Sequence, residues 1–258
     1  MNPVRFSTGV SVKRRALAMV AALPALLFTG TGAAGETGNN WSPPVHDNIV
    51  LSKIMLDRLE MRGTDAGNLA YWEGQAWVGS DINKLWLKSE GGVLKGRTEE
   101  ADLEALYSRA MTAFWDLQAG VRHDFGTGEK PAREWAAIGL KGLAPYRFDV
   151  DATAYVGAAG RTAARVKAEY EVLLTQRLIL MPELEFNAYG KEDRARGLGS
   201  GLSDVGLALR LRYEIRRELA PYAGVRWTRK FGGTADFARQ GGEAVQDTQW
   251  VVGLRSWW

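Results

Sequence analysis

Apolar and polar side chains alternate along most of the chain after about residue 49. The last segment, 247–258, shows the pattern well: Trp250 and Val252 fall on an apolar face, whereas Gln249 and Arg255 fall on a polar one. A repeat of two places successive side chains on opposite sides of an extended backbone. The segment is therefore predicted to be a β-strand with one apolar and one polar face.

The same alternation predicts eleven further strands before the last one. The acidic segment 98–109 also fits a helix, and the alternation is weak in the first half of 50–61, where both faces are apolar. The chain ends on Trp258, and Ser256 stands where a large apolar residue is usual in a closing strand. The predicted strands are 50–61, 69–79, 83–90, 98–109, 114–124, 134–142, 147–156, 161–174, 178–188, 202–216, 222–230 and 247–258.

The links between these strands tend to alternate in length, with 157–160 as the exception. Short turns at one end and long loops at the other are typical of outer-membrane barrels, and a soluble β-sandwich has no reason to sort its loops in this way. Ten tryptophans, many near strand ends, fit the aromatic girdles of such barrels. The short links are 80–82, 110–112, 143–145, 175–177 and 217–221, and the longer ones are 62–68, 91–97, 125–133, 189–201 and 231–246.

We therefore predict an all-β protein, a transmembrane antiparallel up-and-down β-barrel of about 12 strands that occupies residues 49–258. The apolar faces would contact outer-membrane lipid, and the charged faces would line the lumen. An even number of strands leaves both termini on one side of the outer membrane, which we expect to be the periplasm.

Residues 1–34 have the pattern of an export signal. A head with four basic residues precedes an apolar run, 16–28, that is too short to span a bilayer as a helix. Small residues follow, and Ala33 with Ala34 suits a signal peptidase. We predict a signal peptide at 1–34 and a short periplasmic lead-in at 35–48.

Charge and cysteine content narrow the chemistry of the mature chain. Removing the four basic residues of the signal leaves 29 basic against 30 acidic residues, so a nucleic-acid partner is not expected. The chain has no cysteine, which excludes disulfides, thiolate metal sites and cysteine nucleophiles. The mean hydropathy of −0.22 also suits a barrel, because half of each strand faces a polar lumen.

Several stretches of the chain resemble the copper-resistance protein B family of Gram-negative bacteria. They are Asp57-Arg-Leu-Glu60, Gly79-Ser-Asp-Ile-Asn-Lys-Leu-Trp-Leu-Lys-Ser-Glu90, Leu106-Tyr-Ser-Arg109, Phe114-Trp-Asp-Leu-Gln-Ala-Gly-Val-Arg122 and Ala220-Pro-Tyr222.

The resemblance implies an outer-membrane barrel that acts in copper tolerance, by binding the copper ion or by moving it outward. It also implies the barrel assembly machinery and periplasmic copper proteins as partners. Many family members carry a long Met- and His-rich segment before the barrel. This chain has one histidine and no methionine between its signal and its first strand.

Copper(I) prefers thioether and imidazole ligands, and copper(II) prefers imidazole and carboxylate. Met181 falls on a charged strand face, whereas Met61 and His123 fall on apolar faces, and no His-x-His or Met-x-x-Met motif occurs. A structural role is the alternative for each of them. The candidate ligands are His46, Met55, Met61, His123 and Met181.

The charged faces of the later strands are the stronger signal. Acidic and basic rows on neighbouring strands would form an ionic network that narrows the bore, or a path for cations, or both. The predicted lumen-lining residues are Asp149, Asp151, Glu169, Glu171, Glu183, Glu185, Arg210 and Arg212.

Two other functions fit the same barrel. The first is a narrow non-specific pore or a structural barrel without a copper site. The second is a lipid hydrolase with Ser108 and His123, but these residues fall at opposite ends of adjacent strands, so we predict no enzyme activity. The glycine-rich segment 197–201 has no strand and helix around it to form a phosphate site, and we interpret it as a flexible extracellular loop.

Overall fold

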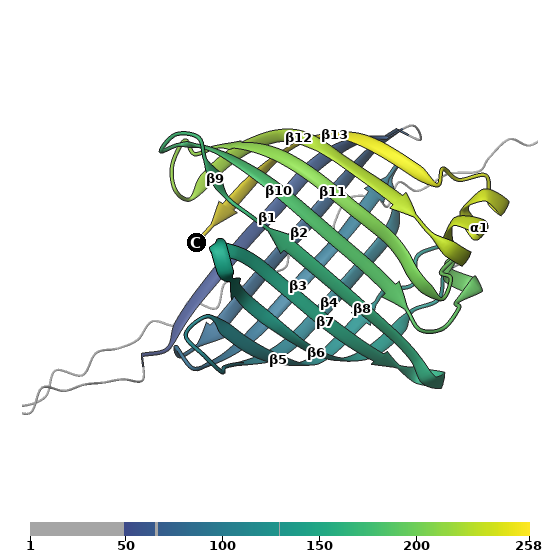
Figure 1. Cartoon of the computed structure of the whole chain (residues 1–258), viewed down its shortest axis with the longest axis horizontal. Helices are drawn as coiled ribbons and strands as arrows, with labels where there is room; N and C mark the ends of the chain where they lie inside the picture. The colour runs from purple at the N-terminus through teal and green to yellow at the C-terminus, as the bar shows by residue number, and fades with distance from the viewer. Residues whose placement is uncertain (1–48, 65–66, 129) are drawn as a thin grey trace, which may run out of the picture. The chain divides into compact units, whose positions relative to one another are not determined.

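The computed structural model describes residues 49–64, 67–128 and 130–258, which form an antiparallel β-barrel (Figure 1). The predicted signal peptide, the lead-in and His46 lie outside the described residues. The strands are β1 (Leu51–Thr64), β2 (Gly67–Gly79), β3 (Asn83–Leu94), β4 (Arg97–Ala110), β5 (Trp115–Asp124), β6 (Arg133–Ala144), β7 (Phe148–Gly157), β8 (Arg161–Glu169), β9 (Val172–Leu173), β10 (Leu178–Tyr189), β11 (Gly201–Tyr213), β12 (Leu219–Lys230) and β13 (Gln246–Trp257).

Apart from β8 and β9, which both pair with β10, each strand pairs with its neighbours in sequence, and β1 pairs with β13 to close the barrel. Because β8 and β9 share one position in the wall, the barrel has twelve strand positions. Ile54 and Trp258 exchange backbone hydrogen bonds of 3.0 and 2.9 Å, so β1 starts and β13 ends at the same end. We call this the short-turn end and the opposite one the long-loop end. The predicted fold class is confirmed.

The prediction of one continuous strand over 161–174 is wrong, because the structure has two strands there, β8 and β9. The ladder between β8 and β10 stops at the pair Glu169 and Glu183 and resumes between β9 and β10. Pro182 lies opposite Tyr170, in the gap between these two ladders. Its carbonyl accepts a hydrogen bond from the Tyr170 amide at 3.1 Å. Proline has no N–H to return to Tyr170, and this missing bond interrupts the strand.

A β-bulge in β1 explains the weak alternation of its first half. Leu56 pairs with Gly74 and Arg58 with Glu73, which leaves Asp57 as an extra residue. A bulge lets two consecutive side chains point to the same side of a sheet. Asp57 and Arg58 both line the interior of the barrel as a result.

Two of the predicted long loops, 62–68 and 91–97, are wrong because the strands continue through them. Only residues 65–66 separate β1 from β2, and only Lys95 and Gly96 separate β3 from β4. Lys95 and Gly96 have φ of 50° and 77°, which is the left-handed pair that joins two strands in a tight hairpin.

The long link between β12 and β13 contains an α-helix, α1 (Gly232–Gln240), which the alternation did not predict. Its Thr234 Oγ1 accepts a hydrogen bond from the Gly199 amide at 2.9 Å and lies 3.1 Å from Ser203 Oγ. The glycine-rich segment 197–201, predicted to be a flexible loop, therefore packs against α1. No helix in the described part of the chain is long and apolar enough to cross a membrane.

The outer face of the barrel is apolar, but the interior is not purely ionic. Leu59, Met61 and Val252 are exposed on the outside, as the alternation predicts for lipid contact. Trp86 and Trp135 instead point inward and are buried with Leu106, Ala137 and Tyr155. These two tryptophans do not belong to an interfacial girdle, since they share the inward parity of charged residues on the same strands.

Candidate functional site

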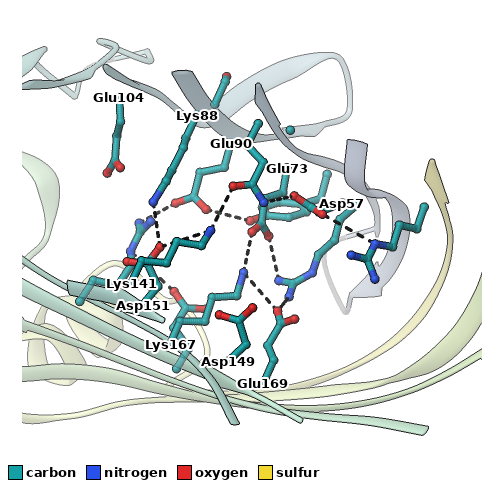
Figure 2. Close-up of a pocket in the computed structure, with 18 of the residues that line it drawn as sticks. Asp57, Glu73, Lys88, Glu90, Glu104, Lys141, Asp149, Asp151, Lys167 and Glu169 are labelled. Atoms are coloured by element: carbon teal, nitrogen blue, oxygen red, sulfur yellow. Dashed lines mark hydrogen bonds and ion pairs between the residues drawn. The ribbon is translucent and has the colours of Figure 1, made fainter. Parts of the chain in front are cut away.

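The barrel interior holds a cavity of about 170 Å³, shown in Figure 2. Carboxylates, lysines and arginines from opposite sides of the barrel line it, together with Met181 and the tyrosines at 71, 155 and 222. The volume suits a few water molecules or an ion and lies below the roughly 300 Å³ at which ordinary small-molecule pockets begin.

The predicted lumen residues lie in or beside this cavity. Asp149, Asp151, Glu169, Glu185, Arg210 and Arg212 line it directly. Glu183 is buried beneath the lining, where its carboxylate contacts Arg58 and Arg210. Glu171 lies nearer the short-turn end, 3.0 Å from Arg212 and 3.5 Å from Arg255.

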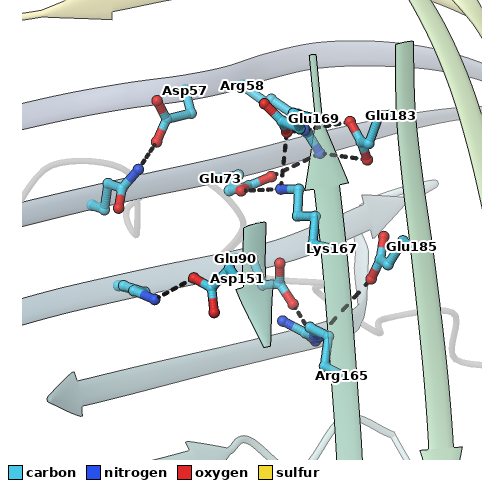
Figure 3. Close-up of polar contacts among 12 residues, drawn as sticks. Asp57, Arg58, Glu73, Glu90, Asp151, Arg165, Lys167, Glu169, Glu183 and Glu185 are labelled. Carbon is cyan, nitrogen blue, oxygen red and sulfur yellow. Dashed lines mark hydrogen bonds and ion pairs between the residues drawn. The ribbon is translucent and has the colours of Figure 1, made fainter. Parts of the chain in front are cut away.

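Four side chains of alternating charge form a closed ring across the cavity, which we call the four-charge ring (Figure 3). Glu73 on β2 lies 2.9 Å from Arg58 Nη1 and 2.6 Å from Lys167 Nζ. Glu169 on β8 completes the ring, 3.5 Å from Lys167 and in contact with Arg58. The ring joins β1 and β2 to β8 on the far wall.

More polar contacts cross the lumen on either side of this ring. Arg165 on β8 lies 2.5 Å from Glu90 on β3, and Lys88 on β3 lies 2.8 Å from Asp151 on β7. Nearer the long-loop end, the Tyr155 hydroxyl donates to a carboxylate oxygen of Glu104 at 2.7 Å. The wall of β1 to β4 is thus tied to the wall of β7 to β10.

Arginines surround the buried carboxylate of Glu183. Arg210 Nη1 lies 2.5 Å from one of its oxygens, and Arg226 Nη1 lies 3.4 Å from the other. Arg58 contacts both oxygens. Removing ions from water is strongly unfavourable unless opposite charges and hydrogen bonds replace the hydration, so this clustering keeps the interior charged.

Asp149 differs from the other carboxylates that line the cavity. It is directly opposite Glu169 in the ladder between β7 and β8, and it is exposed. Within residues 49–64, 67–128 and 130–258, its carboxylate has no hydrogen bond or ion pair, whereas each other lining carboxylate has at least one. Figure 2 shows it beside Lys167 and Glu169.

The structure brings one of the candidate copper ligands into the cavity. Met181 lines it, and its sulfur accepts a hydrogen bond from Arg212 at 3.1 Å. Met55 packs against the interior aromatic cluster. Met61 is half exposed on the outer face, and His123 also faces outward, 3.8 Å from Glu134. No group of three or more His, Asp or Glu side chains in the described part of the chain is placed to hold a metal ion.

The Ser108 and His123 pair considered for lipid hydrolysis lies on opposite faces of the wall. Ser108 is fully buried inside, where its hydroxyl donates to Asp116 at 3.2 Å. His123 packs edge-on against Phe125 with ring centroids 4.8 Å apart. A nucleophile and its base must lie within hydrogen-bond reach, so this pair cannot act together.

Sequence reasoning did not single out Arg58, Glu73 or Lys167 as site residues. Each occupies a polar face in the alternating pattern, so the pattern predicts that they enter the lumen. The curvature and stagger of the closed sheet determine which charges meet across the lumen. The pattern of a single strand gives no information on either.

Comparisons with known proteins identify the family to which the sequence is similar. A family model described as copper resistance protein B precursor (CopB) matches residues 50–258. The copper resistance protein B homolog of Pseudomonas syringae pv. tomato is 48% identical over 213 residues, which cover 83% of this chain and 72% of that protein. Copper resistance protein B of Escherichia coli is 44% identical over 220 residues, covering 85% and 74%.

Among solved structures, the NanC porin superposes with a TM-score of 0.52 at 9% identity, covering 80% of this chain and 99% of that one. At this identity the likeness concerns the barrel fold alone.

Proposed function

We propose that this chain, which belongs to the copper resistance protein B family, supports copper tolerance by letting copper ions pass outward through the lumen of its outer-membrane barrel. The observation that carries the proposal is the small cavity lined by carboxylates and by Met181. Copper is the substrate of this path, and it would meet carboxylate and thioether ligands in turn.

Passage of copper ions fits this interior better than their storage. Most of the lumen carboxylates are engaged with arginines and lysines, so a copper ion would exchange with tethered cations instead of entering a ready set of ligands. Conduction requires sites that bind well enough for an ion to enter and weakly enough for it to leave. The candidate ligands Met61 and His123 face lipid, away from the cavity, and we assign them no copper role.

The proposal includes an orientation, with the short-turn end in the periplasm and the apolar outer wall in lipid. Met181 and the half-exposed Glu171 lie toward that end and would receive copper from a periplasmic copper protein. Insertion in this orientation would use the barrel assembly machinery, as for other outer-membrane barrels.

Deletion and complementation test the function. A strain without the gene should grow less well as copper is raised and should retain more periplasmic copper, measured by mass spectrometry. The wild-type gene should restore both values. Unchanged growth and copper content after deletion would contradict the proposal.

A second candidate, a narrow barrel without copper preference, is favoured by the ion pairs that cross the lumen. The cavity is too small for an oligosaccharide, so such a barrel would conduct only small ions. Planar-bilayer recordings separate the two functions. A potassium current that copper ions neither block nor contribute to supports the barrel without copper preference. Copper ions that carry current or block it support the copper path.

A further inference from the structure

We propose that Lys167 is a movable gate in the lumen, which closes the path by bridging Glu73 and Glu169 and opens it by moving to Asp149. This inference rests on the proposed passage of cations. It concerns two positions of the Lys167 ammonium group. The structure shows the group between Glu73 and Glu169, and the second position, at Asp149, is vacant.

The closed position is the four-charge ring. The Lys167 ammonium lies 2.6 Å from Glu73 on β2 and 3.5 Å from Glu169 on its own strand, so it bridges opposite walls. Its side chain is largely buried, with 18% of its surface exposed. The ammonium lies between these two carboxylates in the cavity (Figures 2 and 3). In the proposed path, an ion that moves along the cavity passes between them.

The vacant position is the carboxylate of Asp149. Asp149 is directly opposite Glu169, and Lys167 is directly opposite Asp151, so Lys167 and Asp149 are diagonal neighbours on the same inward face of β7 and β8. Long side chains reach such diagonal neighbours. In the described part of the chain, no cation lies within ion-pair distance of the Asp149 carboxylate. Lys141 on β6 is its diagonal neighbour on the other side but donates to Gln75, so Asp149 offers Lys167 an ionic partner without breaking an existing pair.

Lys167 suits this movement better than Arg58, the other cation of the ring. Lysine carries a compact charge on a flexible four-carbon stem, whereas arginine holds carboxylates through a planar fork. Arg58 contacts Glu73, Glu169 and Glu183 at once. Movement of Arg58 would leave three carboxylates without it, whereas Lys167 releases two.

The proposed exchange also predicts that the path selects ions by charge. When Lys167 pairs with Asp149, Glu73 and Glu169 lose a shared cation, and an arriving cation takes its place. An anion meets two carboxylates at the same point and is repelled. The path therefore opens only for positive ions, and the tethered ammonium returns when the ion leaves.

Chemical restoration of the charge tests the gate. The chain has no cysteine, so Lys167→Cys introduces a single thiol. In planar bilayers, the full mature protein purified from outer membranes should show low potassium conductance. Lys167→Cys should raise it severalfold, with a reversal potential that reports cation selectivity. An aminoethyl methanethiosulfonate reagent, which restores an ammonium, should return the current toward the wild-type level, and a sulfonate reagent of similar size should not.

A matched control is Lys95→Cys, because Lys95 is an exposed lysine in the hairpin between β3 and β4 and lies outside the cavity. This variant should conduct as the wild type does. Equal currents in the wild type and in Lys167→Cys would overturn the proposal, as would closure by both reagents, since that indicates blockage by size.

Asp149→Asn tests the vacant position in a chain that keeps Lys167. It should reduce the frequency of openings severalfold in the wild-type background and leave Lys167→Cys unchanged. Unaltered opening in the wild-type background would remove Asp149 from the model. These currents are carried by potassium, so a gate without copper tolerance would count against the copper function alone, and copper tolerance without these effects would count against the gate alone.

Discussion

Lys167 Nζ on β8 lies 2.6 Å from Glu73 Oε1 on β2, six strand positions away around the barrel wall. This ion pair crosses the full lumen. It makes the interior of the barrel a connected ionic structure, with a small cavity inside it in place of a wide channel.

Loss of Arg58 should destabilise the barrel strongly. Arg58→Met leaves Glu73, Glu169 and Glu183 without their shared guanidinium, and removing one partner of a buried ion pair typically costs roughly 3–5 kcal/mol. Urea unfolding in lipid vesicles measures the change. Arg194→Ala is the control, because Arg194 is 82% exposed and should unfold with the wild type. Equal stability of all three proteins would show that the ring adds nothing.

Copper handling should depend on Met181 and not on His123. Met181→Leu removes the thioether that lines the cavity and keeps a similar volume, so copper tolerance should fall. His123→Ala changes an outward-facing side chain and should leave tolerance unaltered. Growth of complemented deletion strains across a copper series measures both. Loss of tolerance in His123→Ala with normal tolerance in Met181→Leu would indicate that copper binds at the outer wall instead.

Pro182→Ala should join β8 and β9 into one strand. The Tyr170 amide already donates to the carbonyl of residue 182, and the new amide at position 182 can donate in return to the Tyr170 carbonyl. One such hydrogen bond adds about 1 kcal/mol to stability. Amide hydrogen exchange should slow in residues 170–172. Faster or unchanged exchange there would show that something other than the proline interrupts the strand.

Acid should loosen the loop that contains Asp193. Burial alone would raise the pKa of Asp193, but a hydrogen bond from Arg133 and the charges of Arg133, Arg161 and Arg196 bring it below the ordinary value. A lowered folded pKa means that this contribution is fully present above the ordinary aspartate pKa and is lost as the pH falls through the folded pKa.

Limited proteolysis of residues 190–200 against pH measures this effect. Cleavage should increase on acidification in the wild type, and Asp193→Asn should be cleaved readily at every pH. Asp236→Asn in α1 is the control, because Asp236 is well exposed and pairs with Arg239 on its own helix. A pH-independent cleavage rate in the wild type would contradict the anchoring role of Asp193.

Most strand positions, the two faces of the regular strands and the fold class follow from the sequence alone. Alternation with a period of two is a local property, so segments such as 202–216 and 247–258 predict their inward and outward side chains without knowledge of their neighbours. The position of Ser256 shows the limit of this reasoning. Its hydroxyl donates to the Glu218 carbonyl at 2.8 Å, a contact that no pattern in its own strand reveals.

Only the tertiary structure decided which charges meet. Closing the sheet sets the stagger of the strands, and the bulge at Asp57 shifts the local register. The pairing of Lys167 with Glu73 and the lack of an ion pair at Asp149 in the described part of the chain both depend on that closure. Sequence patterns place each residue on a face, and the curvature of the closed barrel determines what that face opposes.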